Sequence, residues 1–203
     1  VIESLSARYL EHYGHKGKLT PNLDRFADEG LFFNNLYATG TRTVRGLEAI
    51  LLSVPPTPGQ SILRRPKSDG LFNLGTVFSR KGYQTQFLYG GYAYFDNMKQ
   101  WFSGNGFEVV DRANMKDSEI QFANAWGVCD EDLFSMVIRQ ADELTKQNKK
   151  FMQVVLTTSN HRPYSYPDGK IDIPSLSGRD GAVKYTDYAI GKFVEEAKTH
   201  SWY

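Results

Sequence analysis

The most constraining feature of this sequence is the alternation of strand-like and helix-like segments along its 203 residues. Short apolar runs are separated by segments whose apolar residues recur at helical spacing. We expect strands at 1–2, 31–36, 84–89, 107–110 and 151–157, and helices near 21–29, 43–52, 74–80, 94–102 and 180–198. A further helix should begin at 130–132 and end among Lys146, Lys149 and Lys150. This alternation predicts an α/β fold with a mostly parallel central sheet and helices on both faces.

The segments form one domain, because no repeat, low-complexity tract or linker divides them. The chain starts at Val1-Ile2, which is typical of the tail of a strand, and it stops at Ser201-Trp202-Tyr203, where another strand is due. We therefore expect a fragment, truncated at both ends.

Four polar clusters follow the predicted strands. They are Glu3-Ser4, the turn 40–46, Tyr89-Gly90-Gly91 and the segment 157–161, which contains Asn160 and His161. Parallel sheets bind their ligands outside the carboxyl ends of the strands. The four clusters should therefore meet at one edge of the sheet and form a site, although each could by itself be an ordinary turn or a solvated side chain.

The turn 40–46 reads G-T-R-T-V-R-G and lies between a predicted strand and a predicted helix. A helix start offers unpaired N–H groups and the positive end of the helix dipole, and Arg42 and Arg45 add fixed positive charge. This pattern suits phosphate or sulfate oxygens. The alternative is that Thr43 merely caps the helix and that both arginines are solvated.

Overall charge and cysteine content narrow the classes of partner. The net charge is only +1, so no overall field favours nucleic acid, and recognition has to be local. Cys129 is the one cysteine, so no internal disulfide forms, and its acidic neighbours indicate a packing role. His12 and His15 have a spacing compatible with metal binding but lack a third ligand nearby.

Five motifs, in the same order, resemble the lipoteichoic acid synthase-like branch of the sulfatase and alkaline phosphatase superfamily. The motifs are VIESLSA at 1–7, LTPNLDRFA at 19–27, FFNNLYATGTRTVRGLE at 32–48, WGVCDEDLF at 126–134 and SNHRPY at 159–164. The resemblance implies an alkaline phosphatase/sulfatase-like fold and a partial catalytic domain over 1–203 whose C-terminal part is absent.

The resemblance also implies an activity. Thr43 would be both nucleophile and metal ligand, Glu3 a second metal ligand, and His161 a substrate contact. Asn160, Arg42 and Arg45 would complete the substrate site. The metal would be a divalent ion (Mn, Mg, Ca or Zn), and the reaction would pass through a phospho-threonine. The donor would be a phospholipid or glycerol-phosphate head group and the acceptor a hydroxyl. The chain would be the extracytoplasmic, periplasmic domain of a protein anchored in the inner membrane by a segment absent here.

The sequence also departs from that family. No Asp-His dipeptide, the family's second pair of metal ligands, occurs in the chain. We expect this pair beyond Tyr203, and weak metal binding and no turnover without it. The segment 94–98 lacks the tryptophan and arginine of the Gram-positive synthases. Phosphoethanolamine transfer, sulfatase-type hydrolysis and a non-catalytic binding domain stay open as alternatives, although the C/S-x-P-x-R motif of sulfatases is absent.

Overall fold

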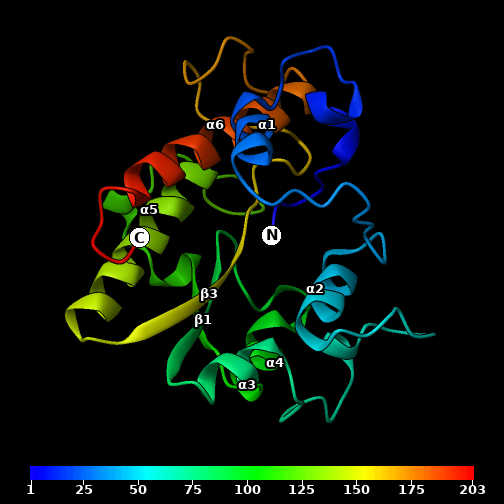
Figure 1. Ribbon diagram of the computed structural model, residues 1–203, viewed down its shortest axis with the longest axis vertical. Helices are drawn as coiled ribbons and strands as arrows, with labels where there is room; N and C mark the ends of the chain where they lie inside the picture. Colours follow the sequence, from blue (N-terminus) through cyan, green and yellow to red (C-terminus); the bar gives the residue numbers. More distant parts are fainter.

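The computed structural model describes residues 1–203, and a three-stranded parallel sheet lies at its centre (Figure 1). The strands are β1 (Tyr83–Tyr89), β2 (Glu108–Asp111) and β3 (Lys150–Leu156), in the order β2-β1-β3. Three predicted strands are therefore confirmed, each to within one residue. The strand predicted at 1–2 is not formed, although the start of the chain lies beside the end of β3, where the amide of Thr157 donates a hydrogen bond of 3.1 Å to the carbonyl of Val1.

Six α-helices surround the sheet. They are α1 (Pro21–Glu29), α2 (Thr43–Leu52), α3 (Leu74–Ser79), α4 (Met98–Gly104), α5 (Asp130–Lys146) and α6 (Arg179–Ala197). Short 3₁₀ turns cover 7–9, 11–13, 62–64, 95–97, 112–114 and 117–119. The helix predicted over 94–102 is shorter than expected, because Asp96 and Asn97 adopt left-handed backbone angles that interrupt it.

The helices cover both faces of the sheet, as predicted. Figure 1 shows α5, α6 and α1 on one side of the strands and α2, α3 and α4 on the other. Consecutive residues of a strand point to opposite faces, so Phe87 and Leu88 belong to different cores. Phe87 packs with Trp101 and Phe102, whereas Leu88 packs with residues of α5 such as Leu133. Both clusters are buried, and together they fix the position of the strand ends.

The strand predicted at 31–36 is wrong, because this segment forms a loop between α1 and α2. Leu31 is 84%, Phe33 65% and Leu36 80% exposed. No backbone–backbone hydrogen bond is formed by the segment. A strand is stable only when a neighbour pairs with its backbone, and the apolar run alone does not show whether such a neighbour is present.

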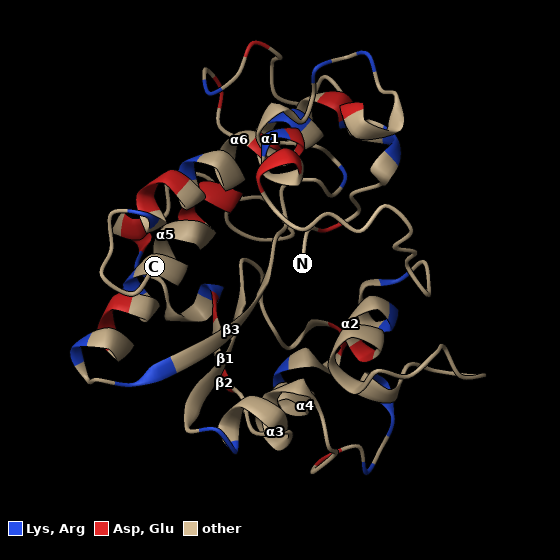
Figure 2. Ribbon diagram, in the orientation of Figure 1, with Lys and Arg blue, Asp and Glu red and all other residues tan.

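Charged residues are unevenly distributed around this framework. Asp and Glu gather on α1, α5 and α6, whereas Lys and Arg lie mostly in loops and at helix ends (Figure 2). None of the helices is both long enough and apolar enough to span a lipid bilayer.

Candidate active site

Glu3, Thr43 and His161 line one cleft at the carboxyl ends of β1 and β3. The cleft has a volume of about 20 Å³, which is room for a single water molecule or ion. The other residues that line it are Tyr89, Phe95, Met98, Trp126, Thr157 and Thr158. The structure therefore brings together three predicted site residues that are far apart in the sequence.

The hydroxyl of Thr43 is hydrogen-bonded to a carboxylate. Thr43 is the first residue of α2, and Arg42 occupies the N-cap position. The Thr43 Oγ1 donates to Glu3 Oε2 at 2.9 Å, and the backbone N–H of Glu3 donates to Thr157 Oγ1 at 3.0 Å. The side chain of Thr43 therefore does not cap the helix. It directs its oxygen toward the acidic group, beside the free N–H groups of the helix start.

The side chain of Asn160 holds the backbone of Glu3, and its own amide oxygen has no hydrogen-bond partner. Its side chain is fully buried, and its Nδ2 donates to the backbone carbonyl of Glu3 at 3.0 Å. Its Oδ1 is buried and has no hydrogen-bond partner. A buried polar atom that stays unpaired costs free energy, so the Oδ1 of Asn160 is an unfavourable feature of this loop.

His161 packs against Trp126, a residue that the sequence analysis did not assign to the site. The two ring centroids are 3.7 Å apart. Trp126 is held in turn by Asn124, whose Oδ1 accepts hydrogen bonds from the backbone N–H groups of Trp126 and Gly127. The only signal in the sequence was the place of Trp126 at the start of the motif 126–134.

The two arginines of the turn have different surroundings. Arg45 pairs with Glu48 at 2.7 Å and also donates to the carbonyl of Gly59. Burial opposes ionisation of Glu48, but hydrogen bonds from Ser61, Arg45 and the Ile62 amide together lower its pKa. Arg45 thus connects α2 to the following loop. Arg42 is exposed and makes no ion pair, so its charge remains available at the helix start.

Asp130 fixes the loop that carries Asn160 and His161. It is fully buried and accepts hydrogen bonds from the amides of Thr158 and Ser159, both at 3.0 Å, and from Thr186 Oγ1 at 2.8 Å. Burial raises the pKa of the Asp130 carboxyl above its ordinary value. Asp130 therefore joins the loop after β3 to α5 and α6, in addition to placing a negative charge at the start of α5.

The neighbouring acids of α5 have similar roles. Asp132 accepts hydrogen bonds from the amides of Gln121 and Phe122, at the start of the loop that leads to Trp126. Glu131 binds Lys192 at 2.9 Å. Each of the three consecutive acids at the start of α5 thus anchors a different segment. Asp130 holds the loop that carries His161, Asp132 holds the start of the loop that leads to Trp126, and Glu131 holds α6 through Lys192.

Other groups with possible chemistry lie elsewhere or are engaged. Cys129 is buried, and burial raises the pKa of its thiol to about 12, so it is a packing residue. His12 contacts Asp24 at 2.8 Å and Asp28 at 3.1 Å. The ring of His15 accepts a hydrogen bond from the backbone of Gly17.

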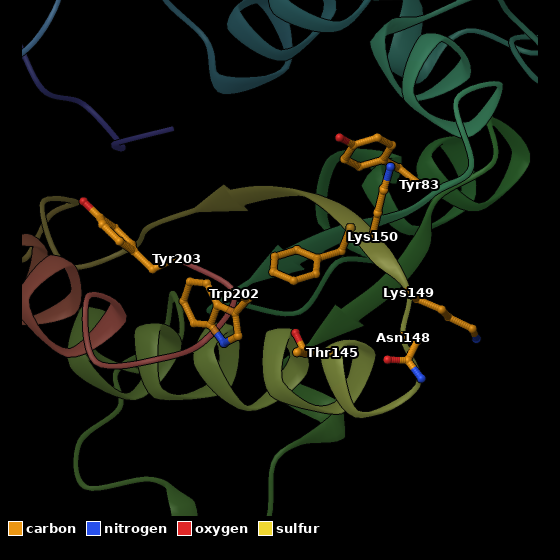
Figure 3. Close-up of a pocket in the computed structure, with 8 residues that line it drawn as sticks. Tyr83, Thr145, Asn148, Lys149, Lys150, Trp202 and Tyr203 are labelled. Carbon is orange, nitrogen blue, oxygen red and sulfur yellow. The ribbon is translucent and has the colours of Figure 1, made fainter.

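A larger hollow lies at the opposite ends of the strands, around the start of β3 (Figure 3). Its volume is about 560 Å³, and its lining includes Tyr83, Lys150 and Trp202. Its lining includes no Asp or Glu side chain and no residue of the four polar clusters. Since size alone does not make a site, the smaller cleft around Thr43 is the better candidate.

The cleft offers hard oxygen donors to a cation. These are the carboxylate of Glu3 and the hydroxyl of Thr43, in a space that holds one ion. Oxygen donors of this kind suit Mg²⁺, Mn²⁺ or Ca²⁺. The residues therefore fit the expected metal in type, but they are a partial set, since no group of three His, Cys, Asp or Glu residues comes together in the structure.

Solved structures define the class of fold. A protein of the alkaline phosphatase superfamily from Vibrio parahaemolyticus is 44% identical, with a TM-score of 0.93 over 100% of this chain and 50% of its own. A lipoteichoic acid synthase from Listeria monocytogenes is 23% identical, with a TM-score of 0.78 over 89% of this chain and 46% of its own. The chain thus has the fold of the alkaline phosphatase superfamily.

The family follows from the sequence comparison. Residues 1–203 match the model of the Sulfatase family, and the chain belongs to this family. Lipoteichoic acid synthase 2 of Bacillus subtilis is 21% identical over 100% of this chain and 32% of its own length. The lipoteichoic acid synthase of Staphylococcus saprophyticus is 28% identical over 61% of this chain and 20% of its own. The chain spans at most about a third of these curated relatives, and the resemblance to the lipoteichoic acid synthase-like branch is confirmed.

Proposed function

We propose that this chain is the nucleophile-bearing part of a metal-dependent phosphoester transferase or hydrolase. The observation that carries the proposal is the hydrogen bond of 2.9 Å between Thr43 Oγ1 and Glu3 Oε2 at the start of α2. An alcohol is a weak nucleophile unless a cation or a base activates it. The site places a hydroxyl, a carboxylate and a helix N-terminus together, a combination that suits attack on phosphorus and stabilisation of the developing charge.

The proposed reaction begins with attack of the Thr43 oxygen on phosphorus. A bond forms between this oxygen and phosphorus, the bond from phosphorus to the leaving alcohol breaks, and the hydroxyl proton passes to solvent water, while Glu3 stays a ligand of the cation. The leaving alkoxide takes up a proton from solvent water, and His161, which lines the cleft, would contact the substrate. An acceptor hydroxyl or water then attacks the phospho-threonine. A bond forms between the acceptor oxygen and phosphorus, the bond from phosphorus to the Thr43 oxygen breaks, and the acceptor's proton ends on the released Thr43 hydroxyl.

In this proposal the positive charges around the cleft stabilise the transferred phosphoryl unit, and other residues hold them in position. Arg42 and the free N–H groups of α2 would bind its non-bridging oxygens, while Arg45 would hold α2 in position through Glu48. Glu3 and Thr43 would hold the divalent ion, which lowers the pKa of a bound hydroxyl and neutralises charge on phosphate. Asn160 would act by fixing the backbone of Glu3.

The relatives support a substrate class. The curated relatives are named as lipoteichoic acid synthases, so we propose a phospholipid or glycerol-phosphate head group as donor and a hydroxyl as acceptor. We further propose that residues 1–203 are part of a larger catalytic domain. That domain would work outside the cytoplasm, in the periplasm, on a protein anchored in the inner membrane.

Mass spectrometry of the full-length protein tests this proposal. After incubation with phosphatidylglycerol or phosphatidylethanolamine and Mn²⁺, we expect a covalent adduct on Thr43 whose mass identifies the transferred group. Thr43→Ala should abolish the adduct and lower turnover at least about 10³-fold. The matched control Thr199→Ala, which removes an exposed hydroxyl at the end of α6, should leave both unchanged. An adduct on any other residue, or full turnover by Thr43→Ala, would contradict the assignment.

A further inference from the structure

His12 lies between two carboxylates of α1. Its ring nitrogen Nδ1 is 2.8 Å from Asp24 Oδ1, and its Nε2 is 3.1 Å from Asp28 Oδ1. Asp24 and Asp28 are one helical turn apart, so their side chains lie on one face of α1 and a single ring reaches both. His12 belongs to the 3₁₀ turn 11–13, in the part of the chain that Figure 1 shows in dark blue beside α1. It therefore connects this turn to the helix.

The geometry around His12 requires a charged ring. A neutral imidazole has one N–H group and one lone pair, so it donates to one carboxylate and turns its lone pair toward the other. An imidazolium has two N–H groups and donates to both. Only the protonated form of His12 therefore satisfies Asp24 and Asp28 together.

Asp24 anchors the turn that carries His12. The Asp24 side chain is 10% exposed, and it accepts hydrogen bonds from the backbone N–H groups of Glu11 and His12, at 3.1 and 3.0 Å. It also accepts from Thr20 Oγ1 at 2.7 Å. Burial opposes ionisation of Asp24, but the hydrogen bonds from Thr20, His12 and Glu11 together lower its pKa. Asp24 is thus held as a carboxylate, which favours the protonated form of His12.

Two acids of α1 and one aromatic ring face His12. The acids are Asp24 and Asp28, and the ring is that of Phe32, whose centroid is 5.2 Å from that of His12. Glu11 is the neighbouring acid on the turn itself, and its backbone N–H is bound to Asp24. The hydrogen bond with Asp24 raises the pKa of His12, and the charge of Asp28 adds to this effect, against the opposing effect of burial. These surroundings favour the imidazolium.

The same turn holds the segment 31–37, which leads from α1 toward the turn 40–46. The Tyr13 ring lies 5.9 Å from that of Phe32, centroid to centroid, and Tyr13 Oη donates to the backbone carbonyl of Asn34 at 3.0 Å. The segment forms no backbone–backbone hydrogen bond. It therefore depends on side-chain contacts such as these for its position.

We propose that His12 is a pH-sensitive clamp. When protonated, it fastens the turn 11–13 to both aspartates of α1 and holds the start of the segment 31–37 through Phe32. When deprotonated, it keeps one aspartate and turns a lone pair toward the other, so that the turn and the segment loosen. The clamp does not depend on the proposed chemistry at Thr43, and the absence of an adduct on Thr43 would leave it untouched.

The direction of the pH effect follows from the raised pKa of His12. Because this pKa is higher in the folded protein than the ordinary value of 6.5, the clamp is fully formed below pH 6.5 and is lost as pH rises through the folded value. We therefore expect the segment 31–37 to be held most firmly in mildly acidic solution and least firmly in alkaline solution.

Limited proteolysis of the full-length protein tests the clamp. Chymotrypsin cleaves after aromatic residues, and Phe32 and Phe33 lie in the segment. Each cleavage rate is divided by that of His12→Gln at the same pH, which cancels the pH dependence of the protease and of other titrating groups. At about pH 6 the native protein should be cleaved about 3- to 10-fold more slowly than His12→Gln, and at about pH 9 the two rates should agree within about 2-fold.

Asp28→Asn separates charge from packing. Its amide oxygen can accept from the imidazolium and its N–H can donate to the neutral ring, so its relative cleavage rate should change less than about 2-fold between the two pH values. The matched control Glu29→Gln removes an exposed acid from the same end of α1 and should behave as the native protein does. Equal cleavage of native protein and His12→Gln at about pH 6, a native ratio that does not change with pH, or full native pH dependence in Asp28→Asn would overturn the proposal.

Histidine-selective ¹³C NMR of the same full-length proteins gives an independent measurement. The His12 signal, assigned by its loss in His12→Gln, should titrate with a pKa above 6.5 in the native protein and with a lower pKa in Asp28→Asn. Glu29→Gln should leave the titration unchanged. A native pKa at or below 6.5, or the same pKa in Asp28→Asn, would also overturn the clamp.

Discussion

Replacement of Asp130 tests how the protein holds the site loop, the segment 157–161 that follows β3 and carries His161. Its carboxylate accepts three hydrogen bonds in the interior, from the Thr158 and Ser159 amides and from Thr186 Oγ1. Asp130→Ala leaves these donors without an acceptor, and a buried unsatisfied donor costs about 1–3 kcal/mol. We expect the free energy of unfolding to fall by about 2–6 kcal/mol, from the two stranded amides, since the Thr186 hydroxyl can turn to another acceptor. This is a large part of the stability of a typical domain.

Asp130→Asn is the conservative comparison. Its remaining oxygen can accept from both amides, and its new amide can donate to Thr186 Oγ1, so we expect a loss of only about 1 kcal/mol at neutral pH. Urea unfolding followed by circular dichroism measures both variants, with Asp117→Asn on the surface as the control. A loss below about 1 kcal/mol in Asp130→Ala, or equal losses in both variants, would refute this account of the loop.

The pH dependence provides a second measurement of the same residue. Burial raises the pKa of Asp130 in the folded protein above its ordinary value of 3.8. The folded state therefore binds more protons than the unfolded state in the window above pH 3.8, and stability falls as pH rises through that window. Asn does not titrate, so the deficit of Asp130→Asn relative to the native protein should shrink from pH 4.5 to pH 7. If the stability difference between Asp130→Asn and the native protein stayed constant or grew from pH 4.5 to pH 7, the raised pKa of Asp130 would be refuted.

Four further substitutions test the core and the site. Phe102→Ala, which removes a fully buried ring stacked 3.7 Å from Phe87, should cost about 3–5 kcal/mol in urea unfolding, against about 0.5 kcal/mol or less for the exposed Ile50→Ala. Gly127→Ala should cost about 2 kcal/mol or more and alter tryptophan fluorescence, because its φ is 156° and a Cβ would lie 2.3 Å from the Gly90 carbonyl oxygen. Gly46→Ala, whose Cβ meets no atom within 4 Å, should instead stabilise α2 by about 0.5–1 kcal/mol, and equal effects of the two glycine changes would contradict the packing argument. Trp126→Leu should slow the proposed transfer about 10-fold in the full-length protein by freeing the ring of His161, and unchanged kcat would exclude this positioning role.

Periodicity predicted most of the framework because it reports which side chains are buried. The alternation of apolar runs and amphipathic helices located β1, β2, β3 and six helices within a few residues. Glu3, Thr43 and His161 do line one cleft, but the rule that ligands bind at the carboxyl ends of parallel strands accounts only for His161, which follows β3, because the strands predicted before Glu3 and Thr43 are not formed. The function of these residues stays a proposal. The failure at 31–36 has a physical reason, since a strand depends on a partner that the local pattern does not contain.

What the sequence by itself determined is therefore the α/β framework and the edge of the sheet at which chemistry is possible, because both follow from local periodicity and chain order. Only the tertiary structure decided which side chains meet there. Trp126 reaches His161, Asp130 secures the site loop and Arg45 turns to Glu48 through contacts between distant segments. Such contacts depend on how helices and loops pack in three dimensions, and no local pattern of residues encodes them.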